Sequence, residues 1–354
     1  MVYLVEQKAG EINMHLKFDT ARKRFFAFFL LGWILLIVSD RAGELRNYQG
    51  AFVAMYSLAI ACLILLTGYS GQLSLGQGAL MAVGGYSAAL TATKLSWHPV
   101  IALIMSVLVA GLVGLLIGFA VARLSGPYLS GTTLALAISL PALANTFPAL
   151  GAEEGIIFNV GSAPAKFGEE FSQYKWFFWI SALAALISIW LISNLLSSKF
   201  GRSWKAIRDN QTAAALSGLN PGKIKVIAFA ISSAFSGLAG ALLVMLISAV
   251  SPSAFPLSLS FLILTGAVVT GVYSLRGVVF GALVLVAIPE IADSVVTSLG
   301  GSERLTSTLP GFLVSMLLIL AVLFSPNGPG DILKTRSSSK KVIGRKQLNI
   351  GNKK

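Results

Sequence analysis

Three polar side chains, Gln72, Ser74 and Gln77, stand in a glycine-rich stretch, residues 67–86, between long apolar runs. Dense glycines interrupt a helix or let backbones approach closely, and polar side chains at membrane depth are tolerated only against protein or a water-filled cavity. Transporters build solute pathways from such broken helices. We therefore predict a translocation pathway with the candidates Gly71, Gln72, Ser74, Gly76 and Gln77. The alternative is tight helix packing in which Gln72 and Gln77 form hydrogen bonds between helices.

A basic segment, residues 199–225, is the second stretch that could carry a function. Its only acid is Asp209, and its cations are Lys199, Arg202, Lys205, Arg208, Lys223 and Lys225. A charge at the centre of a membrane-spanning helix costs roughly 2.5 to 3.5 kcal/mol, so this segment must lie outside the hydrocarbon. Ser203 as N-cap, Gly218 as the C′ residue and Pro221 just beyond predict a short helix within it.

This helix is expected to be amphipathic. At about 100° per residue, one side carries Trp204, Ile207, Gln211, Ala214 and Ala215, and another carries Lys205, Arg208, Asp209 and Thr212. Such a helix either rests on lipid headgroups or forms a docking surface for a partner, and the pattern alone leaves both interpretations open.

Residues for other chemistry are sparse. Glu290 and Asp293 at a helix end give weak support for a proton or sodium relay, and the only histidines are His15 and His98. The phosphate-binding loop of ATPases is missing, since Lys223 is followed by Ile224. We predict that the chain is not an enzyme, holds no metal or cofactor, and depends on another chain if ATP drives it.

The composition places the chain among polytopic membrane proteins. Of its 354 residues 55% are hydrophobic and only 12% are charged. The net charge of +13 could suggest nucleic acid as a partner, but the cations lie in tails and loops between apolar runs. Orientation in a membrane explains that placement better, so we predict no nucleic-acid partner.

The apolar runs predict an all-α protein with about ten transmembrane helices. The runs are 25–39, 51–67, 76–93, 100–122, 128–147, 175–196, 226–250, 257–273, 277–296 and 309–324. Residues 25–325 are therefore the predicted transmembrane domain, after a polar tail, 1–24, and before a basic, low-complexity tail, 326–354, that we expect to be disordered. Eight or nine spans would result if 76–93 or 257–273 were re-entrant.

The distribution of charge predicts the orientation. If the N-terminus is inside and ten spans follow, all but six of the 27 Lys and Arg residues lie on the inner side. The exceptions are Arg41, Arg46, Lys94, Lys166, Lys175 and Arg304. The excess of cations on the inner side favours cytoplasmic termini, a cytoplasmic segment 199–225 and insertion in the cytoplasmic membrane.

Two of these stretches, 68–89 (GYSGQLSLGQGALMAVGGYSAA) and 201–242, resemble the ABC-transporter permeases for branched-chain amino acids, and most closely the M-type subunit. The resemblance extends over roughly residues 45–325. It implies two repeats of inverted orientation, and import of leucine, isoleucine and valine driven by separate ATPase subunits. The implied partners are a second permease subunit, two ATPase subunits and an extracytoplasmic solute-binding protein.

In that family the cytoplasmic segment is the coupling helix that fits a groove on the ATPase subunit. The resemblance assigns this contact to Trp204, Ala206, Ile207, Arg208, Asp209, Asn210, Ala213, Ala214 and Gly218. The chain departs from the family pattern after the eighth run, where Val272 and Tyr273 replace a Gly-Gly-x-Gly turn. Alternatives are a related permease for urea or short amides and an ion-coupled secondary transporter that works alone.

Overall fold

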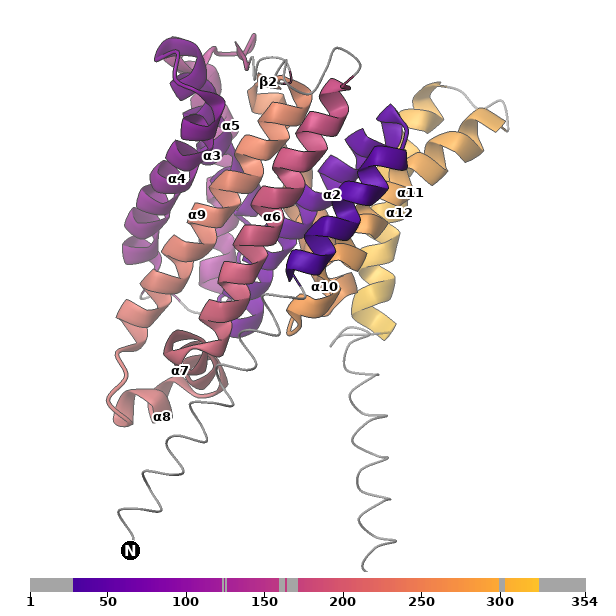
Figure 1. Cartoon of the computed structure of the whole chain (residues 1–354). Coiled ribbons are helices and arrows are strands. Elements are labelled where there is room, and N and C mark those ends of the chain that lie inside the picture. The colour runs from indigo at the N-terminus through magenta and orange to yellow at the C-terminus, as the bar shows by residue number, and fades with distance from the viewer. Residues whose placement is uncertain are drawn as a thin grey trace, which may run out of the picture.

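The fold is a bundle of long helices (Figure 1). The computed structural model describes residues 28–122, 124, 126–158, 163, 171–298 and 303–324. The predicted tails, 1–24 and 326–354, lie outside these residues.

Each of the ten predicted runs coincides with a helix. The first helix covers 28–41; the others are α2 (Glu44–Leu63), which continues as the π-helix η1 (Ile64–Tyr69), α3 (Gln77–Lys94), α4 (Pro99–Val121), α5 (Pro127–Thr146), α6 (Gln173–Ser197), α9 (Pro221–Ile247), α10 (Leu257–Thr270), α11 (Val278–Ser298) and α12 (Glu303–Phe324).

Seven candidate spans in the described residues are long and apolar enough to cross a membrane. They are Glu44–Tyr69, Pro99–Val121, Pro127–Thr146, Gln173–Ser197, Pro221–Ile247, Pro252–Thr270 and Leu275–Val296. These spans establish a multi-pass membrane protein, and the full ten-span arrangement stays a prediction.

Helix α9 packs against α3 and α4 through small residues. A Cβ atom at Gly84 would overlap the backbone of Gly237, and one at Gly240 would overlap the carbonyl of Met81. Lipid is as apolar as leucine, so helices in a membrane associate through close packing rather than through the hydrophobic effect. These glycines therefore bring the backbones of α3 and α9 into contact, and α9 is buried over most of its length.

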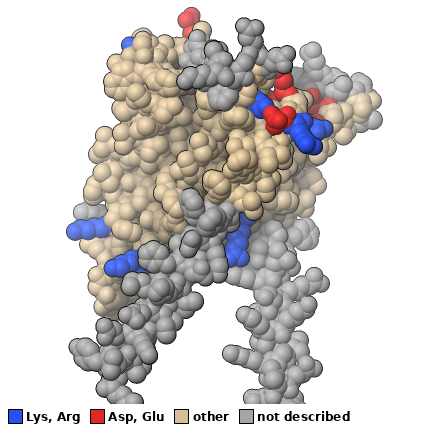
Figure 2. Space-filling model, viewed as in Figure 1, with Lys and Arg blue, Asp and Glu red and all other residues tan. Residues whose placement is uncertain are grey.

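The two ends of the bundle carry different structures. At one end β1 (Ile156–Ile157) pairs antiparallel with β2 (Ala249–Val250) and ties the loop after α5 to the end of α9. At the opposite end lie α7 (Lys199–Asp209) and α8 (Gln211–Leu216), as Figure 1 shows. On the face seen in Figure 2, uncharged residues fill the middle, and acidic side chains gather only at the end away from α7 and α8.

Candidate functional site

The predicted break in the glycine-rich stretch is confirmed. Helix α2 widens into the π-helix η1 and ends at Ser70, and helical structure resumes only at Gln77, the first residue of α3. Gly71 adopts a φ of +71°, a left-handed conformation that glycine enters without strain. We call residues 70–76 the broken segment.

Helices α5 and α10 hold the broken segment and the start of α3 through hydroxyl groups. On α5, Ser130 Oγ donates to the carbonyl of Leu73 (3.1 Å), and Thr133 Oγ1 accepts from the amide of Leu75 (3.0 Å). On α10, Ser260 Oγ accepts from the amide of Gly78 (2.9 Å). Backbone groups that a helix break leaves without helical partners need such hydrogen bonds inside a membrane, so these hydroxyl groups stabilise the break. A Cβ atom at Gly76 would also press on Thr133.

The two glutamines of the pathway prediction bond to α9. Gln72 Nε2 donates to Ser70 Oγ (2.7 Å) and to the backbone carbonyl of Lys225 (3.1 Å). Gln77 Nε2 donates to Ser236 Oγ, whose own hydroxyl donates to the carbonyl of Ser232 (2.7 Å). Ser74 is buried, and its Oγ accepts from the amide of Gly76 (3.3 Å).

One polar atom of this group has no partner. Gln77 is fully buried, and among the described residues nothing forms a hydrogen bond with its Oε1. Gln72 and Ser74 are likewise almost fully buried, and none of the three lines the two cavities found between the helix 28–41 and α6. The hydrogen bonds of Gln72 and Gln77 to α9 are those expected if the stretch serves tight helix packing in this conformation. The role of these residues in a solute pathway stays a prediction.

The basic segment forms two helices where the sequence pattern predicted one. Ser198, not Ser203, is the N-cap of α7, since its Oγ accepts from the amide of Phe200 (3.2 Å). Asn210 ends α7 and caps α8 by accepting from the amide of Ala213 (2.9 Å). Gly218, with a φ of +84°, follows α8 at the C′ position as predicted.

The break at Asn210 changes which side chains share a face. Trp204, Ile207 and Ala214, which were predicted to share one side of a helix, are all buried within this chain, and Trp204 Nε1 donates to the carbonyl of Ile224 (3.1 Å). Gln211 and Ala215 are exposed, so their predicted place on that face is wrong, because the helical period does not continue through a non-helical residue. Five of the nine residues predicted to contact the ATPase are exposed: Ala206, Asp209, Asn210, Ala213 and Gly218.

Arg208 joins α7 to the edge of the broken segment. Its Nη1 donates to the carbonyl of Gly68 (2.6 Å), and its Nε and Nη2 donate to Asp209 Oδ1 at 2.9 and 2.7 Å. The guanidinium lies 5.1 Å from the ring centre of Tyr273, and a Cβ atom at Gly71 would press on the Arg208 side chain. Sequence reasoning placed Arg208 on the partner-facing side and missed this inward contact, for which a single sequence carries no signal.

The remaining candidates for chemistry lie apart. Glu290 and Asp293 are exposed on α11, and His98 caps α4 by accepting from the amide of Val100 (3.3 Å). Within the described residues no group of three or more His, Cys, Asp or Glu side chains could hold a metal ion.

Comparisons with known proteins identify the family of the chain. The family model described as "Branched-chain amino acid transport system / permease component" matches residues 48–323. The high-affinity branched-chain amino acid transport system permease proteins LivM of Escherichia coli and Salmonella typhimurium are each 32% identical over 250 residues, which is 64% of this chain. The chain covers 58% of the length of each.

A third relative is covered more fully. The probable branched-chain amino acid transport permease protein LivH of Methanocaldococcus jannaschii is 28% identical over 312 residues, 83% of this chain and 95% of that protein. No solved structure matches the chain. Since the family model covers more than half of the residues, the chain belongs to the family of permease components of branched-chain amino acid transport systems.

Proposed function

We propose that the chain is a membrane subunit of an ABC importer and forms the pathway for leucine, isoleucine and valine. The family match and the names of the three relatives support the solute class. The observation that carries the proposal is the hydrogen bond from Arg208 to Gly68, because it connects the basic segment to η1, which leads directly into the broken segment. A movement of α7 is thereby passed to the residues proposed for the pathway.

The ATPase contact divides into two groups of residues. Trp204, Ile207, Arg208 and Ala214 face the chain's own packing and hold α7 and α8 in place. The exposed Ala206, Asp209, Asn210, Ala213 and Gly218 receive the ATPase subunit. In this arrangement ATP is bound and hydrolysed on partner chains, consistent with the missing phosphate-binding loop.

The pathway residues Gly71, Gln72, Ser74, Gly76 and Gln77 act in the assembled transporter. The buried Oε1 of Gln77, which has no partner among the described residues, supports this role because a buried polar atom left without a partner costs about 1 to 3 kcal/mol. In a conformation that admits solute, the ammonium group of an amino acid supplies the missing donor. A second permease subunit and an extracytoplasmic solute-binding protein complete the assembly.

The proposed topology has ten spans, two inverted repeats and cytoplasmic termini in the cytoplasmic membrane. The ten helices and the position of α7 and α8 at one end of the bundle support it. On this topology the first tail, 1–24, and the last, 326–354, share the cytoplasm with the basic segment.

The test is reconstitution of this chain with its partner subunits in proteoliposomes. We expect ATP-dependent leucine uptake that isoleucine and valine inhibit by competition and that urea leaves unchanged. Inhibition by urea alone assigns the chain to amide import. Uptake by vesicles that hold this chain alone, driven by an ion gradient, contradicts the proposal and favours a secondary transporter.

A further inference from the structure

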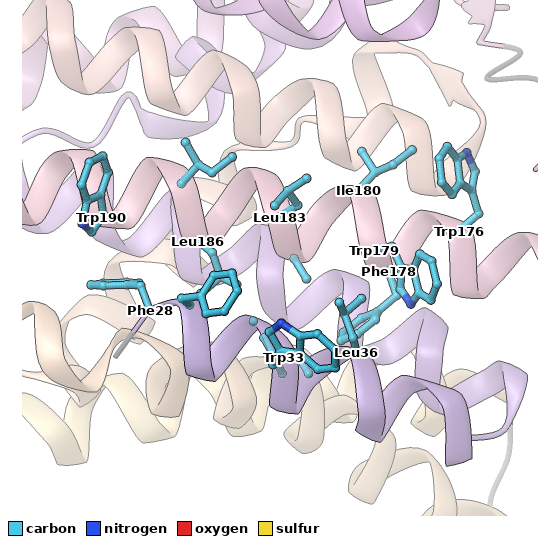
Figure 3. Close-up of a pocket in the computed structure, with 15 residues that line it drawn as sticks. Phe28, Trp33, Leu36, Trp176, Phe178, Trp179, Ile180, Leu183, Leu186 and Trp190 are labelled. Atoms are coloured by element: carbon cyan, nitrogen blue, oxygen red, sulfur yellow. The ribbon is translucent and has the colours of Figure 1, made fainter. Parts of the chain in front are cut away.

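Two apolar cavities lie along the helix 28–41. One cavity, of about 560 Å³, lies between this helix and α6. Figure 3 shows Phe28, Trp33 and Leu36 facing a row of α6 side chains that includes Trp179 and Leu186. Much of this helix is exposed, with 56% of Trp33 and 57% of Val38 accessible.

The second cavity, of about 640 Å³, adjoins the first and extends to α2 and α11. Its walls come from helix 28–41, α2, α6 and α11, and include Leu35, Val53, Ala182 and Leu283. Along α2 it extends from Arg46 to Ser57, eleven residues or ~16 Å at 1.5 Å per residue. This depth is about half of the roughly 30 Å hydrocarbon core, which is the thickness of one lipid leaflet.

One end of this second cavity is basic. Arg41 and Arg46 line it where helix 28–41 ends and α2 begins, and both are exposed. Asp40 is engaged in an ion pair with Lys175. The hydrogen bond from Lys175 holds the pKa of the Asp40 carboxyl below its ordinary value, so this acid stays ionised and paired at neutral pH.

Among the described residues that line the cavity, Arg41 and Arg46 are the charged ones, so the lining itself carries two positive charges, and Glu44 lies between them in the sequence. Figure 2 shows acidic and basic side chains gathered at this end of the bundle, over the ends of the helix 28–41, α2 and α6. An anionic group is therefore attracted to the mouth.

The inner end of the cavity carries a polar atom. Ser57 lines it and is 2% exposed, and no hydrogen-bond partner for its hydroxyl oxygen exists among the described residues. Near the mouth, by contrast, Ser39, Asn47 and Trp179 form a connected set: Ser39 Oγ donates to Asn47 Oδ1 (2.8 Å) and accepts from Trp179 Nε1 (3.2 Å). These bonds hold helix 28–41 to α2 and α6 at the basic end.

We propose that this cavity is a binding site for an anionic phospholipid, with an acyl chain along the apolar walls and the phosphate at Arg41 and Arg46. The apolar length matches one leaflet, and the two guanidinium groups match a negative headgroup at its end. An acyl chain restores the dispersion contacts that an empty apolar space lacks. On the proposed topology the lipid lies in the outer leaflet and joins helix 28–41 to the core.

The proposal is tested by titrating the purified full-length chain with phosphatidylglycerol and with phosphatidylcholine and counting bound lipids by native mass spectrometry. We expect phosphatidylglycerol to bind about 25-fold more tightly, because each of the two arginines near a lipid surface contributes on the order of fivefold. The double variant Arg41→Gln/Arg46→Gln loses this preference. The control Lys94→Gln, at an exposed cation that lines neither cavity, keeps it.

A second variant tests the apolar part of the site. Ala54→Phe places a ring in the cavity and is expected to lower the number of bound phosphatidylglycerol molecules by one while the charge at the mouth is unchanged. Equal binding of the two lipids overturns the proposal, as does an unchanged preference in the double arginine variant. A cross-link between Arg46→Cys and a second permease subunit, with no lipid retained in the assembly, overturns it in favour of a subunit interface.

Discussion

The guanidinium of Arg208 donates a hydrogen bond of 2.6 Å to the backbone carbonyl of Gly68, 140 positions earlier in the chain. Gly68 is the penultimate residue of the π-helix η1, and carbonyls at the end of a helix need partners from outside it. The side chain that a sequence comparison would assign to a partner subunit thus satisfies a carbonyl of its own chain. If α7 moves relative to the bundle, either this bond breaks or Gly68 moves together with Arg208.

Replacing Arg208 with Gln should uncouple ATP hydrolysis from transport. Hydrogen bonds to charged groups contribute about 1.5 to 3 kcal/mol, so losing the contact to Gly68 should lower leucine uptake at least about tenfold. The exposed residues of α7 and α8 are unchanged, so the ATPase subunits should still bind. Uptake and ATP hydrolysis measured in the same proteoliposomes test this.

The matched control is Arg202→Gln, which removes the same charge from an exposed position of α7. This variant should transport normally. Arg208→Lys should remain impaired, since an ammonium cannot reproduce the planar set of contacts that Arg208 makes to Gly68 and Asp209. Normal uptake in Arg208→Gln would show that the contact does not transmit movement.

A bulky side chain on the exposed surface of α8 should block assembly. Ala213 is exposed, so Ala213→Trp should leave folding intact and weaken binding of the ATPase subunit at least about tenfold, by keeping the two surfaces apart. Co-purification in detergent measures binding, and the thermal midpoint measures folding. Glu154→Trp adds the same bulk at an exposed loop position at the other end of the bundle and should assemble normally. Unchanged assembly of Ala213→Trp places the ATPase elsewhere.

Gln77→Leu separates the pathway role from the packing role. The substitution removes the bond to Ser236 but also removes the buried Oε1 that has no partner among the described residues, so stability should change by only about 1 kcal/mol. If solute meets Gln77, uptake should fall at least about tenfold while the ATPase still binds.

Ser87→Ala is the control for this substitution. It removes a bond that stays within α3, from Ser87 Oγ to the carbonyl of Gly84, and should not affect uptake. Full activity in Gln77→Leu, together with a lower thermal midpoint, would instead assign Gln77 to packing alone.

Gly84→Ala should destabilise the contact between α3 and α9. The added methyl group would overlap the backbone of Gly237, and overpacking a close contact costs about 1 to 3 kcal/mol because two helices must move apart. Thermal unfolding in detergent should show a lower midpoint. Gly131→Ala, in α5, is the control, since a Cβ atom there would meet nothing within 4 Å and alanine favours a helix. Equal midpoints for the two variants contradict the close packing.

Several features were predictable because their causes are local. The apolar runs predicted the positions of ten helices, and the glycine-rich stretch predicted the break before α3. Gly218 was predicted as the C′ residue, and it follows α8 in a left-handed conformation. The division of the basic segment at Asn210 was missed, although asparagine is a strong N-cap residue and offered a signal. The predicted helical period was therefore continued past Asn210 to Gln211, Thr212, Ala214 and Ala215, although α7 ends at Asp209.

By itself the sequence determined the membrane class, the positions of the helices and the family, because hydropathy, capping and motifs are properties of neighbouring residues. Only the tertiary structure decided that Arg208 meets Gly68, that Gln77 bonds Ser236, and that Arg41 and Arg46 share the mouth of one cavity. The two bonds join residues 140 and 159 positions apart. Contacts of this kind depend on how complete helices pack, and a hydropathy pattern does not specify that.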